Sequence, residues 1–530
     1  MSDMPISKPG QDRGKEGIGL LKSSSLVGVI TLVSRVFGLI RDLVFAQLIG
    51  AGAAADAFYV AFKIPNFFRR LFSEGAFSQA FVPVLSDYRT NTDAEKVRQL
   101  ISRVSGTLAL VLFGFTAVVV IWPDLFASIF AFGFRAEPNK FVMASAMLQI
   151  TFPYLLLISM TGMAGAVLNS YDRFAVPALT PVLLNICLIS AAFYISPNMS
   201  EPAFGLAWGV LIAGIVQLMF QLPFLASMHL LPVPKWGWND PGVKRILALM
   251  LPAIFGVSVS QINLLLDTLL ASFLPTGSVS WLYYSDRLSE LPLGVIGIAI
   301  ATVILPNLSR QRFSEDSAAF SKTMDWALRI VCLAGVPAAL ALMILAEPIL
   351  TTLFLYGEFS QTDVYMSSLS LRAYALGLVA FMFVKVLAPG YFAQEDMKTP
   401  VRIGVIAMAL NMLFNLLLVY WLHFSYQIGH VGLALATSLS AFVNAGLLFQ
   451  GLRRNGSYQL GQGWGLFVLR LFASCAFMCL VLFYVLDIWT GWFDWSVFER
   501  VIYLAITCGL GLLAFIVSLF VLGLRWRHLH

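Results

Sequence analysis

The sequence predicts an all-α polytopic membrane protein with about 14 transmembrane helices, arranged as two parallel six-helix repeats plus two C-terminal helices. Three observations predict this fold. Hydrophobic residues make up 59% of the 530 residues and charged residues only 12%, against roughly a quarter charged in soluble proteins. Apolar stretches of about 20 residues, long enough to cross a bilayer as a helix, recur along nearly the whole chain. The third observation is an internal duplication.

The expected helices follow a polar N-terminal segment, 1–24, that we expect to be a cytoplasmic tail. Residues 1–22 carry charges of both signs and lack the apolar core of a cleavable signal peptide, so disorder is expected there. The N-terminal repeat should span 25–228 and the C-terminal repeat 229–455, with helices 13 and 14 and a short cytoplasmic tail in 456–530. The expected helix centres lie near residues 37, 70, 112, 155, 185, 213, 258, 296, 334, 378, 410, 441, 477 and 511.

Basic residues gather in the loops on one side of these helices. That side includes Arg89, Lys96, Arg173, Lys235 and Lys398, whereas the other side has little beyond Arg135 and Lys140. Because cytoplasmic loops carry an excess of lysine and arginine, both termini are expected in the cytoplasm. The same loops explain the net charge of +6 better than nucleic-acid binding does.

Short motifs recur about 223–224 residues apart along the chain. A repeat of six helices restores the same orientation, so the two halves should be parallel repeats related by an axis along the membrane normal. The matching pairs are 82–86 with 305–309, 129–133 with 353–357, and Asp172 with Glu395.

Charged residues lie inside several of the expected helices. An ionisable group in hydrocarbon is costly unless it meets a partner or water, so these residues predict a substrate path between the two repeats. Arginine in particular suits a phosphate-bearing cargo. The residues are Arg35, Arg41 and Asp42 in helix 1; Asp56, Lys63, Arg69, Arg70 and Glu74 in helix 2; and Asp286, Arg287 and Glu290 in helix 8.

Structural pairing is the alternative for part of this set, because positive and negative charges are nearly balanced. Arg41 also fits an interfacial anchor. Pro65 removes a backbone donor in helix 2, so either Arg69 or Arg70 is expected to face inward. Ion pairs at a repeat interface also suit a gate that forms and breaks between alternating states.

Several motifs resemble the MurJ (MviN) lipid II flippase family of the multidrug/oligosaccharidyl-lipid/polysaccharide exporter superfamily. The resemblance extends from about Leu21 to the end. It implies a central cavity lined by helices 1, 2, 7 and 8, and a groove for a long lipid tail at helices 13 and 14. It ties function to Arg35, Arg41, Arg69 and Arg287, with Asp56 and Glu290 as acidic positions, and ranks Arg69 above Arg70. The matching segments are 34–38, 41–42, 50–52, 56–58, 63–66, 69–70, 74–83, 278–281, 283–284, 286–287 and 385–390.

The resemblance also indicates a candidate sodium site. Some relatives bind sodium through a helix-7 aspartate and side chains of helices 11 and 12, and the matching residues are Asp267, Asn411, Asn415 and Thr437. Asn415 is neutral where a carboxylate would bind a cation more firmly, and ordinary interhelical hydrogen bonding is the alternative. No other cofactor is expected.

By this resemblance, the function is translocation of lipid II, the lipid-linked peptidoglycan precursor, from the cytoplasmic to the outer leaflet of the bacterial inner membrane by alternating access. Its expected partners are lipid II, membrane lipids and cell-wall synthesis proteins. The alternatives are a cation-coupled multidrug exporter, whose cationic cargo the arginines would repel, and a non-transporting scaffold of cell-wall synthesis. The sequence contains neither a GxxxxGK[ST] loop nor a nucleophile elbow, so enzymatic activity is not expected.

Overall fold

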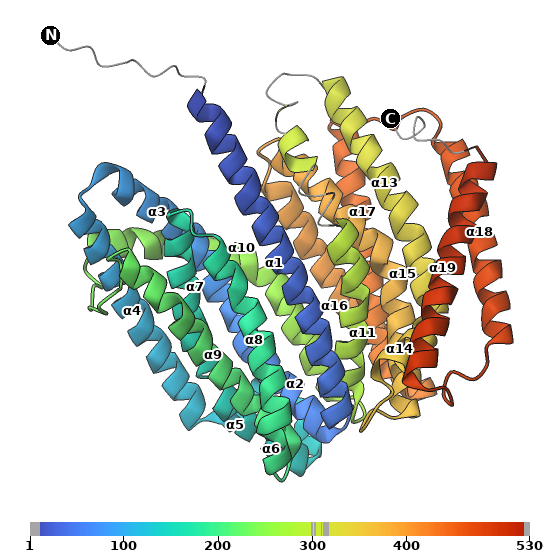
Figure 1. The fold of residues 1–530 in the computed structure, drawn as a ribbon, viewed down its shortest axis with the longest axis horizontal. Coiled ribbons are helices and arrows are strands. Elements are labelled where there is room, and N and C mark those ends of the chain that lie inside the picture. Colours follow the sequence, from blue (N-terminus) through green and yellow to red (C-terminus); the bar gives the residue numbers. More distant parts are fainter. Residues whose placement is uncertain (1–10, 298–299, 301–303, 309, 311–316, 524–530) are drawn as a thin grey trace. The chain divides into compact units, whose positions relative to one another are not determined.

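The computed structural model describes residues 11–297, 300, 304–308, 310 and 317–523 (Figure 1). Every regular element among these residues is a helix, which confirms the predicted all-α class, and all expected helix centres fall within helices. The helices are α1 (Gln11–Ile49), α2 (Ala53–Arg69), η1 (Arg70–Phe77), α3 (Ser78–Asn91), α4 (Ala94–Ile121), α5 (Pro123–Phe130), η2 (Phe132–Ala136), α6 (Pro138–Thr151), α7 (Tyr154–Ser170), α8 (Ala175–Tyr194), η3 (Ser196–Asn198), α9 (Pro202–Ser227), α10 (Pro241–Ser272), α11 (Ser278–Pro292), η4 (Leu293–Gly297), α13 (Ser317–Ile344), α14 (Ala346–Phe354), α15 (Gln361–Phe392), α16 (Lys398–Tyr426), α17 (Gly429–Arg454), α18 (Trp464–Ile488) and α19 (Val497–Val521).

Ten helices in the described part of the chain are long and apolar enough to cross a membrane. The four expected spans that are not among them are centred near residues 37, 70, 258 and 296, in helices 1, 2, 7 and 8. Three of these four hold the charged residues singled out in the sequence, and the fourth holds Asp267. The total of fourteen spans stays a prediction. The ten are Ala94–Ile121, Pro138–Ser170, Ala175–Asn198, Pro202–Ser227, Ala318–Ile344, Gln361–Phe392, Lys398–Tyr426, Gly429–Arg454, Trp464–Ile488 and Val497–Val521.

The two halves repeat the same succession of helices at the predicted spacing of about 223 residues. In each half a long helix, α4 or α13, is followed by a short one, α5 or α14. Each half also has a π-helical segment at the matching position, η1 in the first half and η4 in the second. Because π-helices are rare and occur frequently at functional sites, their recurrence supports the duplication and marks one place in each half.

The predicted match between Asp172 and Glu395 also holds in the backbone. Both residues adopt a left-handed conformation with φ of 62°, which is uncommon outside glycine. The amide after each one reaches back to close the preceding helix, from Arg173 to Leu168 O at 2.9 Å and from Asp396 to Tyr391 O at 3.1 Å. The two halves thus end α7 and α15 with the same turn.

The described residues form two compact units. Unit 1 comprises the chain up to Phe45, Val60–Ala127 and Phe141–Gln261, and unit 2 comprises Ala46–Tyr59, Ser128–Lys140 and the chain from Ile262 onward. Two short segments of the first half therefore belong to unit 2, and α10 is divided between the units. The units differ from the predicted repeats, whose boundaries stay a prediction.

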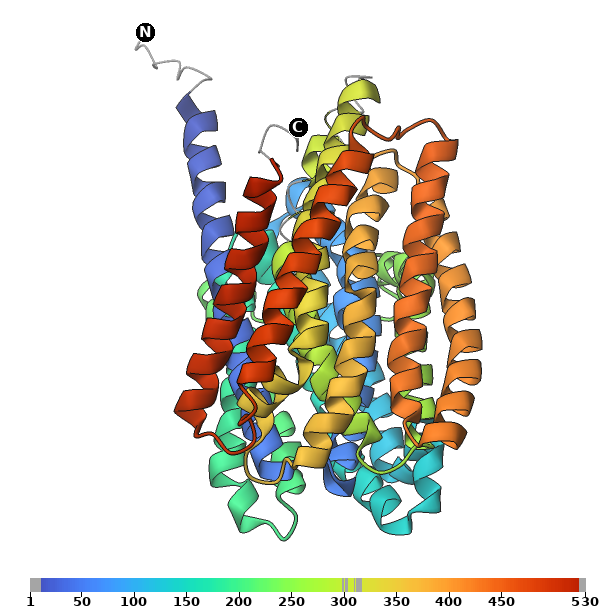
Figure 2. The ribbon, with the colours of Figure 1, turned by 90° about the vertical axis from the view of Figure 1, so that its right-hand side faces the viewer.

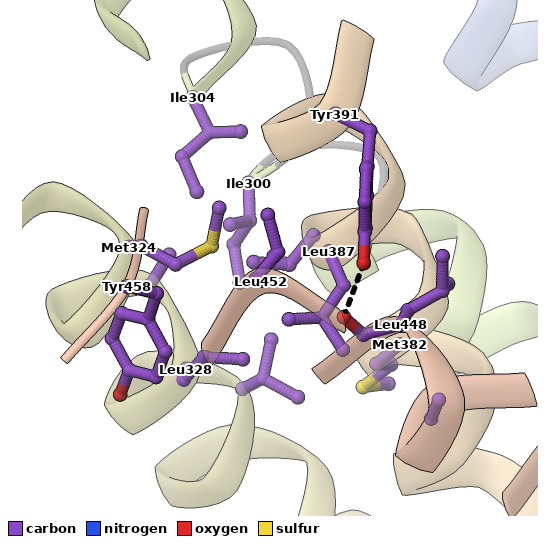
Figure 3. Close-up of a cluster of buried hydrophobic side chains, with 14 of the residues drawn as sticks. Ile300, Ile304, Met324, Leu328, Met382, Leu387, Tyr391, Leu448, Leu452 and Tyr458 are labelled. Atoms are coloured by element: carbon purple, nitrogen blue, oxygen red, sulfur yellow. Dashed lines mark hydrogen bonds between the residues drawn. The ribbon is translucent and has the colours of Figure 1, made fainter. Parts of the chain in front are cut away.

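Each unit has its own apolar core. In unit 1, Phe81, Leu100 and Val167 are buried where α3, α4 and α7 meet. In unit 2, α13, α15 and α17 enclose a cluster that includes Met324 and Leu387, and Figure 3 shows its side chains pointing toward one another. The C-terminal helices α18 and α19 run side by side and pack on α13 and α14 (Figure 2).

The N-terminal segment differs from the expectation. Helix α1 begins at Gln11, so residues 11–22 are helical rather than a disordered tail. Once the apolar span has nucleated a helix, each added residue gains a backbone hydrogen bond at little further cost, so the helix extends into the polar sequence before it. Residues 1–10 of the expected tail lie outside the described residues.

Candidate functional site

The first cationic group lies on α1, in unit 1. Arg41 and Asp42 are buried, with 5% and 3% of their surface exposed. Arg41 donates from Nε and Nη2 to Asp42 Oδ1 at 3.0 and 2.7 Å, and from Nη1 to Asn185 Oδ1 at 3.0 Å. A buried guanidinium keeps its charge, so a carboxylate and an amide must replace its water. Arg41 is therefore held inside the protein, unlike an exposed interfacial anchor.

Asn185 of α8 organises the same region from the opposite side. Its Nδ2 donates to the backbone oxygen of Ser34 at 3.1 Å while its Oδ1 accepts from Arg41, so one amide fastens α8 to α1. Arg35 follows Ser34 and is half-buried, with no ion pair or hydrogen bond to any described residue. Sequence reasoning missed Asn185, although an amide within an otherwise apolar helix was a usable signal.

On α2 and η1, Asn66 holds one of the two neighbouring arginines. Its Oδ1 accepts from Arg69 Nε at 3.1 Å, while its Nδ2 donates to a backbone carbonyl of its own helix at 2.8 Å. Arg69 and Lys63 are half-buried, whereas Arg70, which begins η1, is exposed. This exposure agrees with the order that the resemblance implies, and the role of Arg69 stays a prediction. The side chain of Glu74 lies outside the described residues.

In unit 2, the fully buried Asp56 of α2 caps another helix. Its Oδ2 accepts from the backbone N of Gly277 at 2.8 Å, and its Oδ1 accepts from Ser280 N at 3.0 Å and Ser280 Oγ at 2.7 Å. The first backbone N–H groups of a helix have no partner within it, and a carboxylate there also meets the positive end of the helix dipole. Asp56 therefore fixes the start of α11 to the start of α2.

Matching positions of the two halves contact each other at this point. Asp56 and Ser280 are one repeat period apart, as are Tyr59 and Tyr283, whose rings stack at 4.0 Å between centroids with 23° between their planes. Tyr59 also donates its hydroxyl hydrogen to Tyr284 at 2.7 Å. Within unit 2, the start of α2 and the start of α11 thus meet through equivalent positions of the duplicated sequence.

Two segments of the first half complete this arrangement in unit 2: the α1–α2 corner (Ala46–Tyr59) and the α5–α6 corner (Ser128–Lys140). A Cβ on Gly133 would lie 2.4 Å from Ser272 O at the end of α10, and a Cβ on Gly357 would lie 2.2 Å from Gln47 O at the end of α1. Both are too close for any side chain. The two glycines end the duplicated motifs, so close backbone approach explains why that motif occurs twice.

Lys140 belongs to the site, although only a loop position was expected for it. It is 2% exposed, and its Nζ lies 3.0 Å from Asp56 Oδ2 and 3.2 Å from Thr276 Oγ1. Its ammonium group also lies 4.4 Å from the centre of the Phe134 ring, within the range of a cation–π interaction. The available signal was its rarity, because few cations occur in the loops on that side.

Farther along α11, Arg287 pairs with Glu290 one turn away, Nη1 to Oε2 at 3.2 Å, and lies over the Tyr283 ring at 5.2 Å. Arg287 and Glu290 are 37% and 52% exposed, and Asp286 is exposed as well. Exposed pairs contribute little stability, so the Arg287–Glu290 pair adds little to the fold. That Arg35, Arg41, Arg69 and Arg287 line one chamber stays a prediction.

Three residues of the candidate sodium site, Asp267, Asn411 and Asn415, come together in unit 2. Asn415 Nδ2 donates to Asp267 Oδ1 at 2.7 Å and to Asn411 Oδ1 at 3.0 Å. The buried Oδ1 atoms of Asn415 and Asn263 have no hydrogen-bond partner in the described part of the chain. Thr437 donates to a carbonyl of its own helix. The Asp267 carboxylate also accepts from Asn263 Nδ2, at 3.4 Å, so amide nitrogens face both of its oxygens. Oxygen atoms of these types are ligands of small hard cations, and the sodium site stays a prediction.

Known proteins share this sequence and fold. The family model described as lipid II flippase MurJ matches residues 45–504. The probable lipid II flippase MurJ of Vibrio cholerae is 50% identical over 517 residues, covering 96% of this chain and 97% of that protein. The lipid II flippase MurJ of Burkholderia cenocepacia is 40% identical and covers 90% of this chain and 92% of that protein.

Solved structures agree. Lipid II flippase MurJ in an inward closed conformation matches with a TM-score of 0.77 at 25% identity, covering 93% of this chain and 97% of that one. An inward-facing multidrug transporter of the MATE family matches with a TM-score of 0.64 at 14% identity, over 82% of this chain and 98% of that one, which shows a shared fold alone. These matches confirm the resemblance seen in the sequence: the chain belongs to the MurJ family of lipid II flippases, which are multi-pass bacterial membrane proteins.

Proposed function

We propose that this protein moves lipid II from the cytoplasmic to the outer leaflet of the bacterial inner membrane by alternating access, with both termini in the cytoplasm. The names of its relatives support this proposal. The observation that carries it is the buried Arg41, kept charged by Asp42 and Asn185 in a helical membrane protein. A guanidinium buried among apolar helices and kept charged in this way favours an anionic cargo, and a diphosphate accepts paired hydrogen bonds from arginine side chains.

The arginines differ in how firmly other side chains hold them, and we expect their roles to differ accordingly. Arg41 has acceptors for its Nε, Nη1 and Nη2 atoms and therefore acts as a fixed positive charge. Arg35 makes no ion pair or hydrogen bond to a described residue, Arg69 donates to the neutral amide of Asn66, and Arg287 pairs with the solvated carboxylate of Glu290. We expect these three to bind phosphate oxygens, with Arg41 as a fixed charge beside them. The reaction is transport of an intact molecule and involves no enzymatic step.

Alternating access requires contacts that close one side and break when that side opens. The contacts that Asp56 and Tyr59 make with α11 suit this task, because they join the start of α2 to the start of α11 through polar groups that water can replace. By the distribution of basic loops, this end faces away from the cytoplasm. Asp56 is therefore a gate residue rather than a cargo ligand.

The test is a leaflet-accessibility assay for lipid II in cells depleted of the native protein and supplied with variants. Arg35→Gln and Arg287→Gln remove charge with little change in size, and Arg135→Gln, an exposed cation on the α5–α6 corner, is the matched control. We expect both site variants to lose translocation at normal expression while the control retains it. Translocation retained in both variants contradicts the mechanism, and growth supported without any translocation indicates a scaffold.

We also propose that Asp267, Asn411 and Asn415 hold a sodium ion, whose charge would offset the half-buried carboxylate of Asp267. Sodium that binds the folded state raises the thermal midpoint of unfolding, whereas a closed hydrogen-bond network gives no such shift. The midpoint is compared in sodium and choline buffers of equal ionic strength. Asp267→Asn should abolish the difference, and an equal midpoint of the unaltered protein in both buffers rejects the site.

A further inference from the structure

Lys140 connects two parts of the first half that separately reach into unit 2. Its Nζ lies 3.0 Å from Asp56 of the α1–α2 corner and 3.2 Å from Thr276 Oγ1, between α10 and α11. Glu137 of its own α5–α6 corner lies 3.7 Å away and accepts from Thr276 Oγ1 at 2.8 Å. The ammonium group therefore meets both corners and the second half at one point.

Each corner has contacts of its own with the second half. The α1–α2 corner is held by Asp56 on the start of α11 and by Gln47 O, which accepts from Glu358 N at 3.1 Å. The α5–α6 corner is held by Gly133 N, which donates to Ser272 Oγ at 3.0 Å. Without a link between them, either corner could leave by itself.

The Lys140–Asp56 pair is such a link, and its burial makes it costly to break. Both side chains are at most 2% exposed. If one corner left alone, the other would keep a buried charge that had lost its counter-ion, which is far more costly than losing a surface pair. If both leave together, water hydrates both charges. The pair thus penalises every state in which only one corner is released.

We propose that Lys140 is a positioning residue that makes the two corners leave unit 2 together, so that this end of the protein opens in one step. The inference rests on the proposed function, because opening of this end is a step of alternating access. Lys140 is a further functional cation, because it is not among the charged positions of α1, α2 and α11 or among the four arginines.

The experiment measures release of each corner separately. A cysteine-free version, in which the five free native cysteines are replaced, receives one probe, either Ala51→Cys in the α1–α2 corner or Ala131→Cys in the α5–α6 corner. Both positions are buried, at 7% and 0% exposed. The rate of labelling by a membrane-impermeant maleimide then reports release. Lys140→Met should raise the rate about tenfold at both probes, a common size for the coupling of contacting residues.

Arg135→Met is the matched control, because Arg135 is an exposed cation of the same corner that donates to Ser128 Oγ and lies over the Phe132 ring. Its labelling should equal that of the parent. The double variant, Asp56→Asn with Lys140→Met, should label no faster than the faster of the two single variants. It leaves no unpaired charge, so it replaces Lys140→Met in the experiment if that variant fails to fold. A rise at one probe only, no rise at either probe, or additive effects overturn the inference.

The labelling is measured without lipid II, so the two proposals fail in different ways. Coupled labelling in a protein that does not translocate lipid II contradicts the proposed function and leaves the role of Lys140 intact. Normal translocation with uncoupled labelling contradicts the role of Lys140 alone.

Discussion

The linker between α17 and α18 is held by a buried ion pair on α13, the α13 anchor (Asp325 and Arg329). Asp325 Oδ1 accepts from Tyr458 Oη at 2.8 Å, Gly461 N at 3.1 Å and Trp464 Nε1 at 2.6 Å. Its Oδ2 accepts from Arg329 Nε at 2.8 Å. Burial, and then the neighbouring carboxylate, raise the pKa of Tyr458 well above its usual value, so its hydroxyl remains a donor at physiological pH. One carboxylate therefore fixes the C-terminal helix pair to the second half.

Asp325→Asn keeps the shape of the anchor but removes its negative charge. Arg329 is then left with a buried charge, and loss of one partner from a buried pair costs about 3–5 kcal/mol. Both side chains are about one-tenth exposed, so we take the lower end. Each 1.4 kcal/mol of free energy changes an equilibrium constant about tenfold, so about 3 kcal/mol should raise the fraction of molecules with a released linker about a hundredfold.

Chymotrypsin measures this fraction, because it cleaves after tyrosine and Tyr458 is only 1% exposed. Cleavage after Tyr458, identified from the fragment masses, should be about a hundredfold faster in the folded variant than in the parent. Arg453→Gln is the control, since Arg453 is an exposed cation at the end of α17 that lies over Phe449. Equal cleavage rates in the Asp325→Asn variant and the parent would refute the anchor.

Three further changes test other parts of the structure. Asn185→Leu removes an acceptor of Arg41, and loss of a hydrogen bond to a charged group, about 1.5–3 kcal/mol, should lower the thermal midpoint and translocation. Gly461→Ala places a Cβ 2.6 Å from the anchor carboxylate and should speed the same proteolysis. A hydrogen bond from Arg245 lowers the pKa of Asp87, so this contact stabilises the fold above about pH 3.9. Asp87→Asn should therefore lower the thermal midpoint slightly at pH 7, and the difference from the parent should vanish in acid.

The sequence was sufficient for the fold because the relevant signals are local. The length of the apolar stretches placed every helix centre inside a helix, and the spacing of short motifs predicted the duplication that the turns at Asp172 and Glu395 show again. The start of α1 was less predictable, because a polar stretch that would be irregular alone becomes helical beside a formed helix.

The site was predictable only where the partners lie on one helix or at a repeated position. The spacing of Asn411 and Asn415 correctly placed both on one face of α16. Asn185 and Lys140 were missed because their partners lie far away in the chain, at Arg41 and Asp56. Sequence spacing says nothing about such pairs, so the polar amide and the rare cation could be noticed but not assigned a partner.

The duplication explains the architecture of the proposed gate but not its chemistry. Lys140 and Asp363 occupy matching positions at the starts of α6 and α15, one repeat period apart. Lys140 pairs with Asp56 of α2, and Asp363 accepts from Trp281 Nε1 of α11 at 2.8 Å, so each residue ties the same two elements of its own half. In the first half, two opposite charges make the tie and leave a buried ion if separated. In the second half, the partner of Asp363 is the neutral indole of Trp281, so separating these two residues leaves no unpaired cation. Separating Lys140 from Asp56 is therefore more costly than separating Asp363 from Trp281. We expect opening of this end to be limited by the contact in the first half.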